Sequence, residues 1–579
     1  MFLQKPREVI LVGRGKVKVG PNDYVATGGE GSIYKLADGT IIKLYTDTGK
    51  MIRDAMSEKI ALLTRIQHPY IVAPTGLVTD TNGSPLGFSM PFVGGEPLSR
   101  VFTNDFRVRE GFADEDAATL VDRMRETVNC AHQHRATMVD ANELNWVVAV
   151  HGVRGPEPRV LDVDSWMIGK WPATVIMPSI RDWRAKQFGP STDWFAWGVV
   201  TFQVFTGIHP YKGTLAGYKP AELERRMKDG ASVFAPGVRL NAAVRDFNCI
   251  RGPLLEWYRA TFQQGERSIP PSPFDTGVTV SAAAKVARVI VTGQGILVYD
   301  RLLQGSDDPA IRTFSCGVVL RRSGQLYDLA TKRTIGRVTS RECEVVTRNG
   351  GWLVADWEGD RPTFSYINGS TLTSETLSFQ IRGFKFLVSG NRLFTVTDRG
   401  LTELVWFIFG KKVILGAGNT WGAQVNSTRW YDGVGIQDSM GATFVIVPFG
   451  EKACAQIRVK ELDGLIPLSA KAGNRFVAIM AANKSGEYCK VELTMSQDHA
   501  SYTVWQSGSD TPDLNMAMLP KGVVAGVVKD GELFVFVPTN NSLNKVNDRQ
   551  IATDMILGNW GDTVVYIHDG DVWSVRMRS

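Results

Sequence analysis

The sequence predicts a multidomain chain in which an α+β region is followed by an all-β region. Its 579 residues allow about three to five domain-sized units. Residues before about 275 mix helix-like and strand-like segments, whereas residues 280–579 show almost no helical periodicity. The junction Ile269-Pro270-Pro271-Ser272-Pro273 cannot continue a helix and is typical of a linker. We therefore divide the chain into residues 1–275 and residues 276–579.

The composition is that of an ordinary globular protein, with 44% hydrophobic and 21% charged residues. It excludes a disordered polymer, a collagen and a coiled-coil rod. The net charge of +6 is small for this length, so a nucleic-acid partner or a polybasic membrane anchor is not expected. The six cysteines form no CxxC pair, which argues for reduced thiols and against a zinc ribbon. No run approaches the ~20 apolar residues of a membrane span, and we expect a soluble, cytoplasmic protein.

The first segment that could take part in binding or catalysis is the glycine cluster within residues 24–35. It lies between two β-rich runs. Glycines let a backbone lie close over phosphate groups, although a plain tight hairpin explains them equally well. Ten residues after Ile33, Lys43 stands in an apolar strand, where an ammonium is costly unless it is paired. An edge strand with Lys43 in solvent is the alternative. The helix-like spacing of residues 54–66 supplies Glu58 as a candidate partner.

Further polar residues that are candidates for the site follow along the chain. Residues 114–135 predict a long helix, after which Asp140 and Asn145 stand five residues apart and are followed by an apolar strand. The next strand runs into Asp162-Val163-Asp164-Ser165-Trp166. A very apolar helix then begins near Asp193 and ends in Thr206-Gly207-Ile208-His209-Pro210-Tyr211.

In this order, the segments resemble the protein kinase family, from about residue 20 to residue 272. The Asp-x-Asp-Ser-Trp segment is similar to that of bacterial serine/threonine kinase-like proteins. The resemblance implies a bilobal kinase-like domain, with an N-lobe of about residues 1–93 and a C-lobe of about residues 94–275. It also implies ATP and Mg²⁺ as cofactors.

The resemblance assigns roles residue by residue. Lys43, oriented by Glu58, would bind the α- and β-phosphates, and Asp140 would accept the proton of a hydroxyl nucleophile. Asn145 and Asp164 would hold Mg²⁺, with Asp162 as the alternative ligand. The remaining nucleotide-binding positions would be Ala26, Gly28, Gly31, Ile33, Met90 and Phe92. Two structural roles go to Asp193, which would hold the catalytic loop, and to Arg267, the final conserved arginine.

Several positions depart from the kinase pattern. Met138 and Val139 replace the usual His-Arg pair, and Asn142 replaces a lysine that contacts the transferring phosphate. The glutamate of the A-P-E motif is missing near Met177-Pro178-Ser179, which leaves Arg267 without its usual partner. Because the five principal side chains are all present, the sequence favours an active serine/threonine protein kinase. A small-molecule kinase and a catalytically silent pseudokinase in a larger assembly are the alternatives.

The second region repeats a unit of two β-rich runs joined by a glycine turn. Examples are Ser323-Gly324, Gly390-Asn391, Gly473-Asn474, Asp530-Gly531 and Asp569-Gly570. Such turns between alternating apolar runs are strong hairpin signals. Their average spacing of roughly 40 residues matches one four-stranded blade and predicts a β-propeller of six to eight blades. A β-sandwich pair or a β-solenoid is the alternative. We expect this region to bind a protein substrate or an assembly partner and to tether it near the kinase site.

Overall fold

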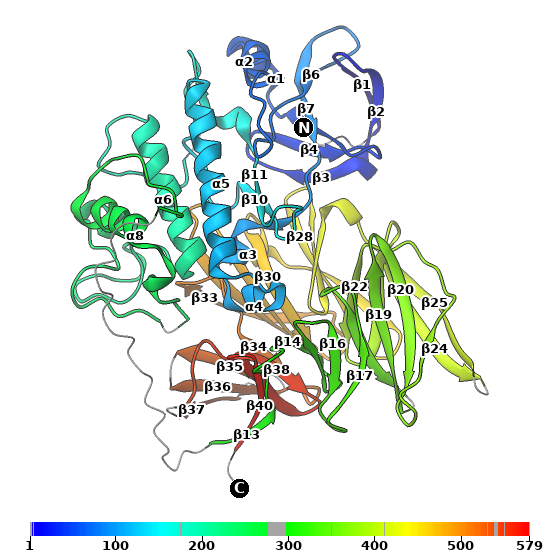
Figure 1. The fold of residues 1–579 in the computed structure, drawn as a ribbon. Helices are drawn as coiled ribbons and strands as arrows, with labels where there is room; N and C mark the ends of the chain where they lie inside the picture. Colours follow the sequence, from blue (N-terminus) through cyan, green and yellow to red (C-terminus); the bar gives the residue numbers. More distant parts are fainter. Residues whose placement is uncertain are drawn as a thin grey trace.

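The computed structural model describes residue 3 and residues 5–173, 176–241, 243–275, 297–348, 350–409, 412–529, 531–537, 542–548 and 550–577. It shows a multidomain chain: a mixed α and β part up to residue 275, then a strand-rich part from residue 297 (Figure 1). The predicted change of architecture is therefore confirmed at this level. The predicted boundary between residues 275 and 276 borders segment 276–296, which lies outside the described residues.

The first part opens with a seven-stranded antiparallel sheet in the order β2-β1-β6-β7-β5-β4-β3. Its strands are β1 (Arg7–Leu11), β2 (Gly15–Val19), β3 (Tyr24–Thr27), β4 (Gly31–Lys35), β5 (Thr40–Tyr45), β6 (Gly76–Thr79) and β7 (Pro85–Pro91). The interior strand β5 is buried along nearly its whole length, and its sequence is a nearly continuous apolar run apart from Lys43. In the register of the sheet, Lys43 lies between Ile33 of β4 and Phe88 of β7. This places the lysine in the middle of the sheet, away from its edges.

The first part also contains α-helices, which are joined by loops and short strands. They are α1 (Thr48–Arg53), α2 (Met56–Leu63), α3 (Leu98–Val101), α4 (Asn104–Glu110), α5 (Asp114–Gln133), α6 (Pro190–Thr206), α7 (Leu223–Asp229) and α8 (Gly252–Arg259). Short strands between them are β8 (Glu96–Pro97), β9 (Ala136–Thr137), β10 (Trp146–Ala149), β11 (Glu157–Val160) and β12 (Met167–Ile168). The long predicted helix is α5, which runs beside α6 in Figure 1.

The sequences of α5 and α6 explain their places in the core. Three acidic residues in the first turn of α5 complement the helix dipole, and Asp116 accepts a hydrogen bond from the Ala113 N–H. From Thr192 to Thr206 every residue of α6 is buried, so this helix is surrounded on all sides. It ends at Gly207, whose φ of 80° is the left-handed conformation that closes many helices. Together α5 and α6 anchor the largest apolar core of the chain.

The second part consists of seven four-stranded antiparallel sheets within the described residues. Six are formed by consecutive strands: β14 (Ala310–Thr313), β15 (Val318–Arg321), β16 (Gln325–Asp328) and β17 (Arg333–Arg337); β18 (Glu344–Arg348), β19 (Gly351–Glu358), β20 (Arg361–Asn368) and β21 (Ser374–Thr376); β22 (Lys385–Ser389), β23 (Arg392–Thr397), β24 (Gly400–Phe409) and β25 (Lys412–Gly422); β26 (Thr428–Tyr431), β27 (Val434–Ser439), β28 (Ala442–Phe449) and β29 (Ala453–Arg458); β30 (Ile466–Gly473), β31 (Phe476–Ala482), β32 (Tyr488–Met495) and β33 (Tyr502–Ser509); β34 (Met516–Met518), β35 (Val524–Lys529), β36 (Glu532–Val537) and β37 (Ser542–Asn547). Several of the predicted glycine turns connect neighbouring strands, as Gly324 and Gly390 do with positive φ angles.

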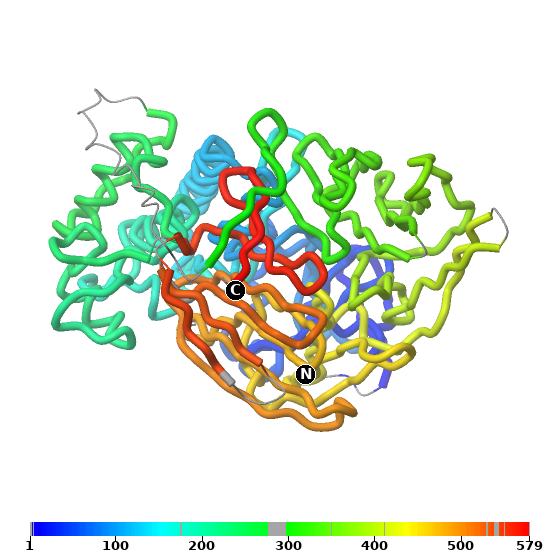
Figure 2. Tube along the Cα trace, turned by 90° about the horizontal axis from the view of Figure 1, so that it is seen from below, coloured from blue at the N-terminus to red at the C-terminus, as the bar shows by residue number. Residues whose placement is uncertain are grey.

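The seventh sheet joins the two ends of the second part. Its strands are β38 (Ile556–Trp560), β39 (Thr563–His568), β40 (Asp571–Met577) and β13 (Leu297–Leu303). β13, the first strand of the region, pairs with β40, the last, so the two ends of the second part lie side by side (Figure 2). First strands of neighbouring sheets also contact one another, as β22 does with β18 and β26.

Candidate functional site

The predicted site residues of the seven-stranded sheet centre on Lys43, whose ammonium donates to two carboxylates. Its Nζ lies 2.8 Å from an oxygen of Asp162 and 2.8 Å from Oδ2 of Asp164. The Tyr45 hydroxyl donates to the same Asp164 oxygen at 2.6 Å. We call Lys43, Tyr45, Lys59, Asp162 and Asp164 the Lys43 cluster. Its two acidic members lie some 120 residues along the chain from Lys43, so the fold itself brings these charges together.

Burial distinguishes the two carboxylates of the Lys43 cluster. The Asp164 side chain is 1% exposed and that of Asp162 is 39% exposed. Burial by itself raises the pKa of Asp164, but the neighbouring Lys43 ammonium holds it below its ordinary value. Burial likewise lowers the pKa of Lys43, and the carboxylates of Asp164 and Asp162 outweigh that effect and raise it. Asp164 is thus the buried counter-ion of Lys43, while Asp162 keeps an oxygen toward solvent.

The predicted pairing of Lys43 with Glu58 is wrong. The Glu58 side chain is 64% exposed and binds Lys170 at 2.9 Å. Helix α2 begins after Ala55, and from that start its inward face carries Lys59, Ile60 and Leu63. Glu58 therefore points outward, and Asp164 takes the position beside Lys43 that the sequence assigned to Glu58.

Lys59 is a member of the cluster that the sequence analysis missed. Its side chain is almost fully buried, and its Nζ donates to the backbone oxygen of Asp164 at 2.6 Å. Burial lowers the pKa of Lys59, an effect that the Asp164 carboxylate partly offsets. The only available signal was helical periodicity, since Lys59 precedes the buried Ile60 and shares its face with Leu63.

The remaining predicted nucleotide-binding residues lie on strands β3, β4 and β7 or directly beside them. Ala26 and Ile33 are cross-strand neighbours in β3 and β4, and the Gly28 N–H donates to the Gly31 oxygen at 2.8 Å. A side chain at Gly31 would collide with the backbone of Leu44, because its Cβ would lie 2.5 Å from that carbonyl oxygen. Close packing of two strands is therefore a sufficient reason for this glycine. Met90 pairs with Ile41, and the half-exposed ring of Phe92 lies 3.6 Å from the Lys35 ammonium.

The loop between β9 and β10 holds Asp140 and Asn145 in contact. The Asn145 side-chain amide donates to the backbone oxygen of Asp140 at 2.7 Å. One Asp140 carboxylate oxygen accepts hydrogen bonds from the Met177 N–H at 2.7 Å and from the Asn142 amide at 3.0 Å. Burial raises the pKa of Asp140 to about 6. The Leu161 N–H donates to the Asn145 oxygen at 2.8 Å, so this loop lies beside the chain that carries Asp162.

Asp193 fixes the start of the same loop from α6. Its two oxygens accept the backbone N–H groups of Met138 and Val139 at 2.8 and 2.9 Å. The His132 ring nitrogen, from α5, lies 2.9 Å from one of those oxygens. Val139 has a positive φ of 58°, a strained conformation for a β-branched residue that these contacts hold in place.

Arg267 has a partner that the sequence analysis did not find. Its guanidinium binds both oxygens of Asp182, at 2.7 and 2.9 Å. Asp182 is buried and follows the Met177-Pro178-Ser179 segment by three residues. The acidic residue was visible in the sequence, but it stands at a different spacing from the glutamate of the A-P-E motif.

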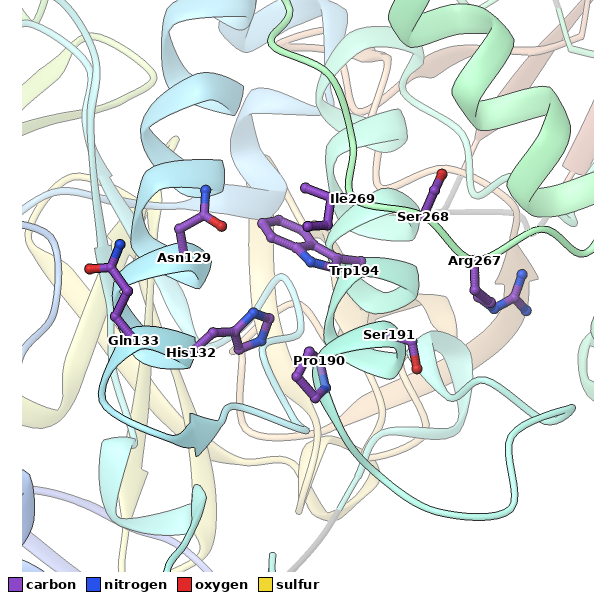
Figure 3. A pocket seen from close by; sticks show the side chains of 9 residues that line it. All are labelled: Asn129, His132, Gln133, Pro190, Ser191, Trp194, Arg267, Ser268 and Ile269. Atoms are coloured by element: carbon purple, nitrogen blue, oxygen red, sulfur yellow. The ribbon is translucent and has the colours of Figure 1, made fainter.

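Two cavities lie away from the Lys43 cluster. One, of about 520 Å³, opens beside α5, α6 and the chain at Arg267, with the rings of Trp194 and His132 on its wall (Figure 3). It contains no carboxylate and no lysine among the residues that line it. We therefore assign it no part in the Lys43 cluster chemistry.

The second cavity, of about 1060 Å³, lies between the α3–α4 segment and the first strands of several small sheets. The charged residues in its lining come from four elements and one turn: Arg109 of α4, Arg312 of β14, Lys385 of β22, Lys471 of β30, and Asp432 between β26 and β27. Burial raises the pKa of Asp432, but Lys471, Arg312 and Arg109 together hold it below its ordinary value. No local sequence pattern predicts this cavity, because its lining comes from segments that lie far apart along the chain.

The residues beside Lys43 have the chemistry to bind a metal ion, but they do not form a complete set of metal ligands. Asp162 and Asn145 offer oxygen ligands of the type that Mg²⁺ prefers. Both oxygens of Asp164 are already bound by Lys43 and Tyr45. Across the described residues, no group of three or more His, Cys, Asp or Glu side chains is arranged to hold a metal. Asp162 and Asn145 therefore remain available as ligands, and the Glu30 carboxylate lies 4.0 Å from the Lys43 ammonium.

Comparison with known proteins identifies no relative, since no family model and no curated protein matches the chain. Within the described residues, no helix has both the length and the apolar character to cross a membrane.

Proposed function

We propose that the first part of the chain is a bilobal, protein kinase-like domain that transfers the γ-phosphate of ATP to a hydroxyl group. The observation that carries the proposal is the convergence of Lys43, Asp162 and Asp164 beside the loop that bears Asp140 and Asn145. These residues follow the order of the kinase motifs in the sequence. A serine/threonine protein acceptor follows from the resemblance, with a small-molecule acceptor as the alternative.

Each side chain has a part in this reaction. Lys43 holds the α- and β-phosphates, and Asp164 rather than Glu58 keeps its ammonium in place. Asp162 and Asn145 would hold Mg²⁺, which would supply positive charge to neutralise the phosphates. Asp140 accepts the hydroxyl proton as the oxygen forms its bond to the γ-phosphorus and ADP leaves. This assigns the principal metal ligand to Asp162, the alternative in the sequence analysis, because the oxygens of Asp164 are already bound.

We propose that the seven small sheets form a β-propeller, supported by the pairing of the first strand with the last and by contacts between successive first strands. Such a domain serves as a rigid platform for a protein partner or substrate.

A catalytically silent, structural role is the second candidate. It is favoured by the contacts of Asp140, whose carboxylate already accepts the Met177 N–H and the Asn142 amide. It is also favoured by the outward position of Glu58. In that role, the Lys43 cluster is a structural ion-pair network.

Radiolabel transfer from γ-labelled ATP in the presence of Mg²⁺ separates the two candidates. An active kinase labels itself or a generic acceptor protein, and Asp140→Asn reduces the rate at least 100-fold. Asp398→Asn, at an exposed carboxylate in the second part, leaves the rate unchanged. In a thermal-shift assay, Mg·ATP stabilises the wild type, and Asp162→Asn removes the Mg²⁺-dependent part of the shift. Absence of both transfer and any nucleotide-dependent shift in the wild type would establish the structural role.

A further inference from the structure

The loop that carries Asp140 and Asn145 is covered by the small sheets of the second part. Leu144, between those two residues, packs against an apolar cluster that includes Leu468 and Phe476. Its neighbour Glu143 is only 2% exposed. Two consecutive residues of the proposed catalytic loop are thus inserted into the packing of a distant region of the chain.

Tyr488, at the start of β32, makes the polar contact in this interface. Its hydroxyl donates to Oε1 of Glu143 at 3.2 Å and lies 3.5 Å from the Gln203 side-chain oxygen on α6. The second Glu143 oxygen has no hydrogen-bond partner among the residues that the structure describes. Burial raises the pKa of the Glu143 carboxyl. The Tyr488 hydroxyl is therefore the main polar partner of a buried side chain in the middle of the loop.

Lys212 fixes the tyrosine ring from the other side. Its ammonium lies 4.7 Å from the ring centroid, and it reaches the backbone oxygen of Ser509 at 3.5 Å. The Lys212 side chain is buried, as is Tyr488. A cation over a desolvated aromatic face is attractive, so the ring has little freedom to leave Glu143. The adjoining turn contributes further contact, since Gly486 lies against Met177 and Ser179.

We propose that Tyr488 is a positioning residue for phosphate transfer, acting through Glu143 on the loop that holds Asp140 and Asn145. The inference rests on the proposed kinase function and makes the second part an integral support of the catalytic loop. Asp193 fixes the beginning of the loop, and Tyr488 fixes its middle. Small displacements of reacting groups are costly in rate, so a lost support lowers turnover while the ion pairs of Lys43 with Asp162 and Asp164 remain in place.

The test is Tyr488→Phe in the full chain, which keeps the ring and removes the hydroxyl. We expect kcat for phosphate transfer to fall about tenfold, with the KM for Mg·ATP within about twofold of wild type, because the Lys43 cluster does not touch Glu143. Tyr502→Phe is the matched control, since it removes a hydroxyl that binds Glu461 at 2.7 Å far from the loop. It should leave both constants unchanged. Glu143→Ala should reduce kcat similarly, and the double variant should lose no more than the larger single loss.

Hydrogen–deuterium exchange of residues 138–147 provides a readout that needs no activity. Tyr488→Phe should speed exchange in this loop at least fivefold, and Tyr502→Phe should not. An unchanged kcat in Tyr488→Phe, or an exchange rate equal to that of the control, overturns the inference. If the wild type transfers no phosphate but exchange still rises in Tyr488→Phe, the kinase proposal fails while the coupling of Tyr488 to the loop stands.

Discussion

The Lys43 cluster and the interface around Glu143 both bury charged side chains, but they satisfy them differently. In the cluster, Asp164 accepts hydrogen bonds from Lys43 and Tyr45, and the neighbouring Lys59 also has a partner. At the interface, one oxygen of Glu143 and the hydroxyl of the nearby Ser179 lack hydrogen-bond partners within the described part of the chain.

A satisfied network and a partly satisfied one have different consequences. Fully paired buried groups rigidify a site, whereas unpaired ones leave an energetic penalty that a change of partner can relieve. The Lys43 cluster is accordingly a preorganised network of paired charges, as the proposed binding of phosphate groups requires. The Glu143 interface is the more adjustable region, and it is one of the contacts between the two parts of the chain.

Breaking the Lys43 cluster should have the largest effect on the free energy of unfolding. Lys43→Met leaves the Asp164 carboxylate buried without its main counter-ion. We expect the free energy of unfolding to fall by about 3–5 kcal/mol, measured by urea denaturation. Lys170→Met, which removes an exposed partner of Glu58, is the matched control and should cost less than about 1 kcal/mol. Equal losses in the two variants would show that the cluster is not a tightly coupled network.

The same contrast explains what the sequence could predict. Lys43, Asp140 and Asn145 were predicted as site residues from their order and spacing, and the fold places them in one region through Asp162. The hairpins of the second part were predicted from local turn chemistry. Which face of a short helix points inward depends on where that helix begins. The start of α2 after Ala55 therefore decided between Glu58 and Lys59 in a way that no motif encodes.

Contacts between distant regions were beyond sequence reasoning for a different reason. Tyr488 and Glu143 are 345 residues apart, and neither stands in a recognisable pattern. Their meeting depends on how the two parts pack. The expectation that the second part only tethers a partner came from treating it as a separate module, whereas it contacts the Asp140 loop directly.

We expect a smaller effect on the free energy of unfolding at His209. This residue follows α6 and binds Ser179, close to the Met177 N–H that donates to Asp140. Its Nε2 donates to the Ser179 oxygen at 2.8 Å, while Nδ1 accepts the Tyr211 N–H at 3.2 Å, so the ring is neutral in this arrangement. Burial lowers its pKa to about 3, below the ordinary value of 6.5. Its stabilising contribution is therefore complete above pH 6.5 and is lost as the pH falls toward 3.

The pH dependence of unfolding checks this assignment. Between pH 6.5 and pH 5.5 the titration of His209 should lower the free energy of unfolding by about 1 kcal/mol. His209→Gln, which keeps a donor and an acceptor but does not titrate, should reduce the slope by that amount. An identical slope in wild type and variant would mean that folding does not change the pKa of His209, and the assignment would be wrong.

The smallest effect is expected at Glu58, where the sequence and the structure disagree most directly. Its carboxylate is largely in solvent and binds only the exposed Lys170 ammonium. Surface pairs of this kind contribute little, so Glu58→Gln should change the free energy of unfolding by no more than about 0.5 kcal/mol. If Lys43 takes its orientation from Asp164, the same variant should also leave phosphate transfer within about twofold of wild type. A 100-fold loss of transfer would instead mean that α2 rotates during the reaction and brings Glu58 to Lys43, and the two carboxylates would then exchange roles.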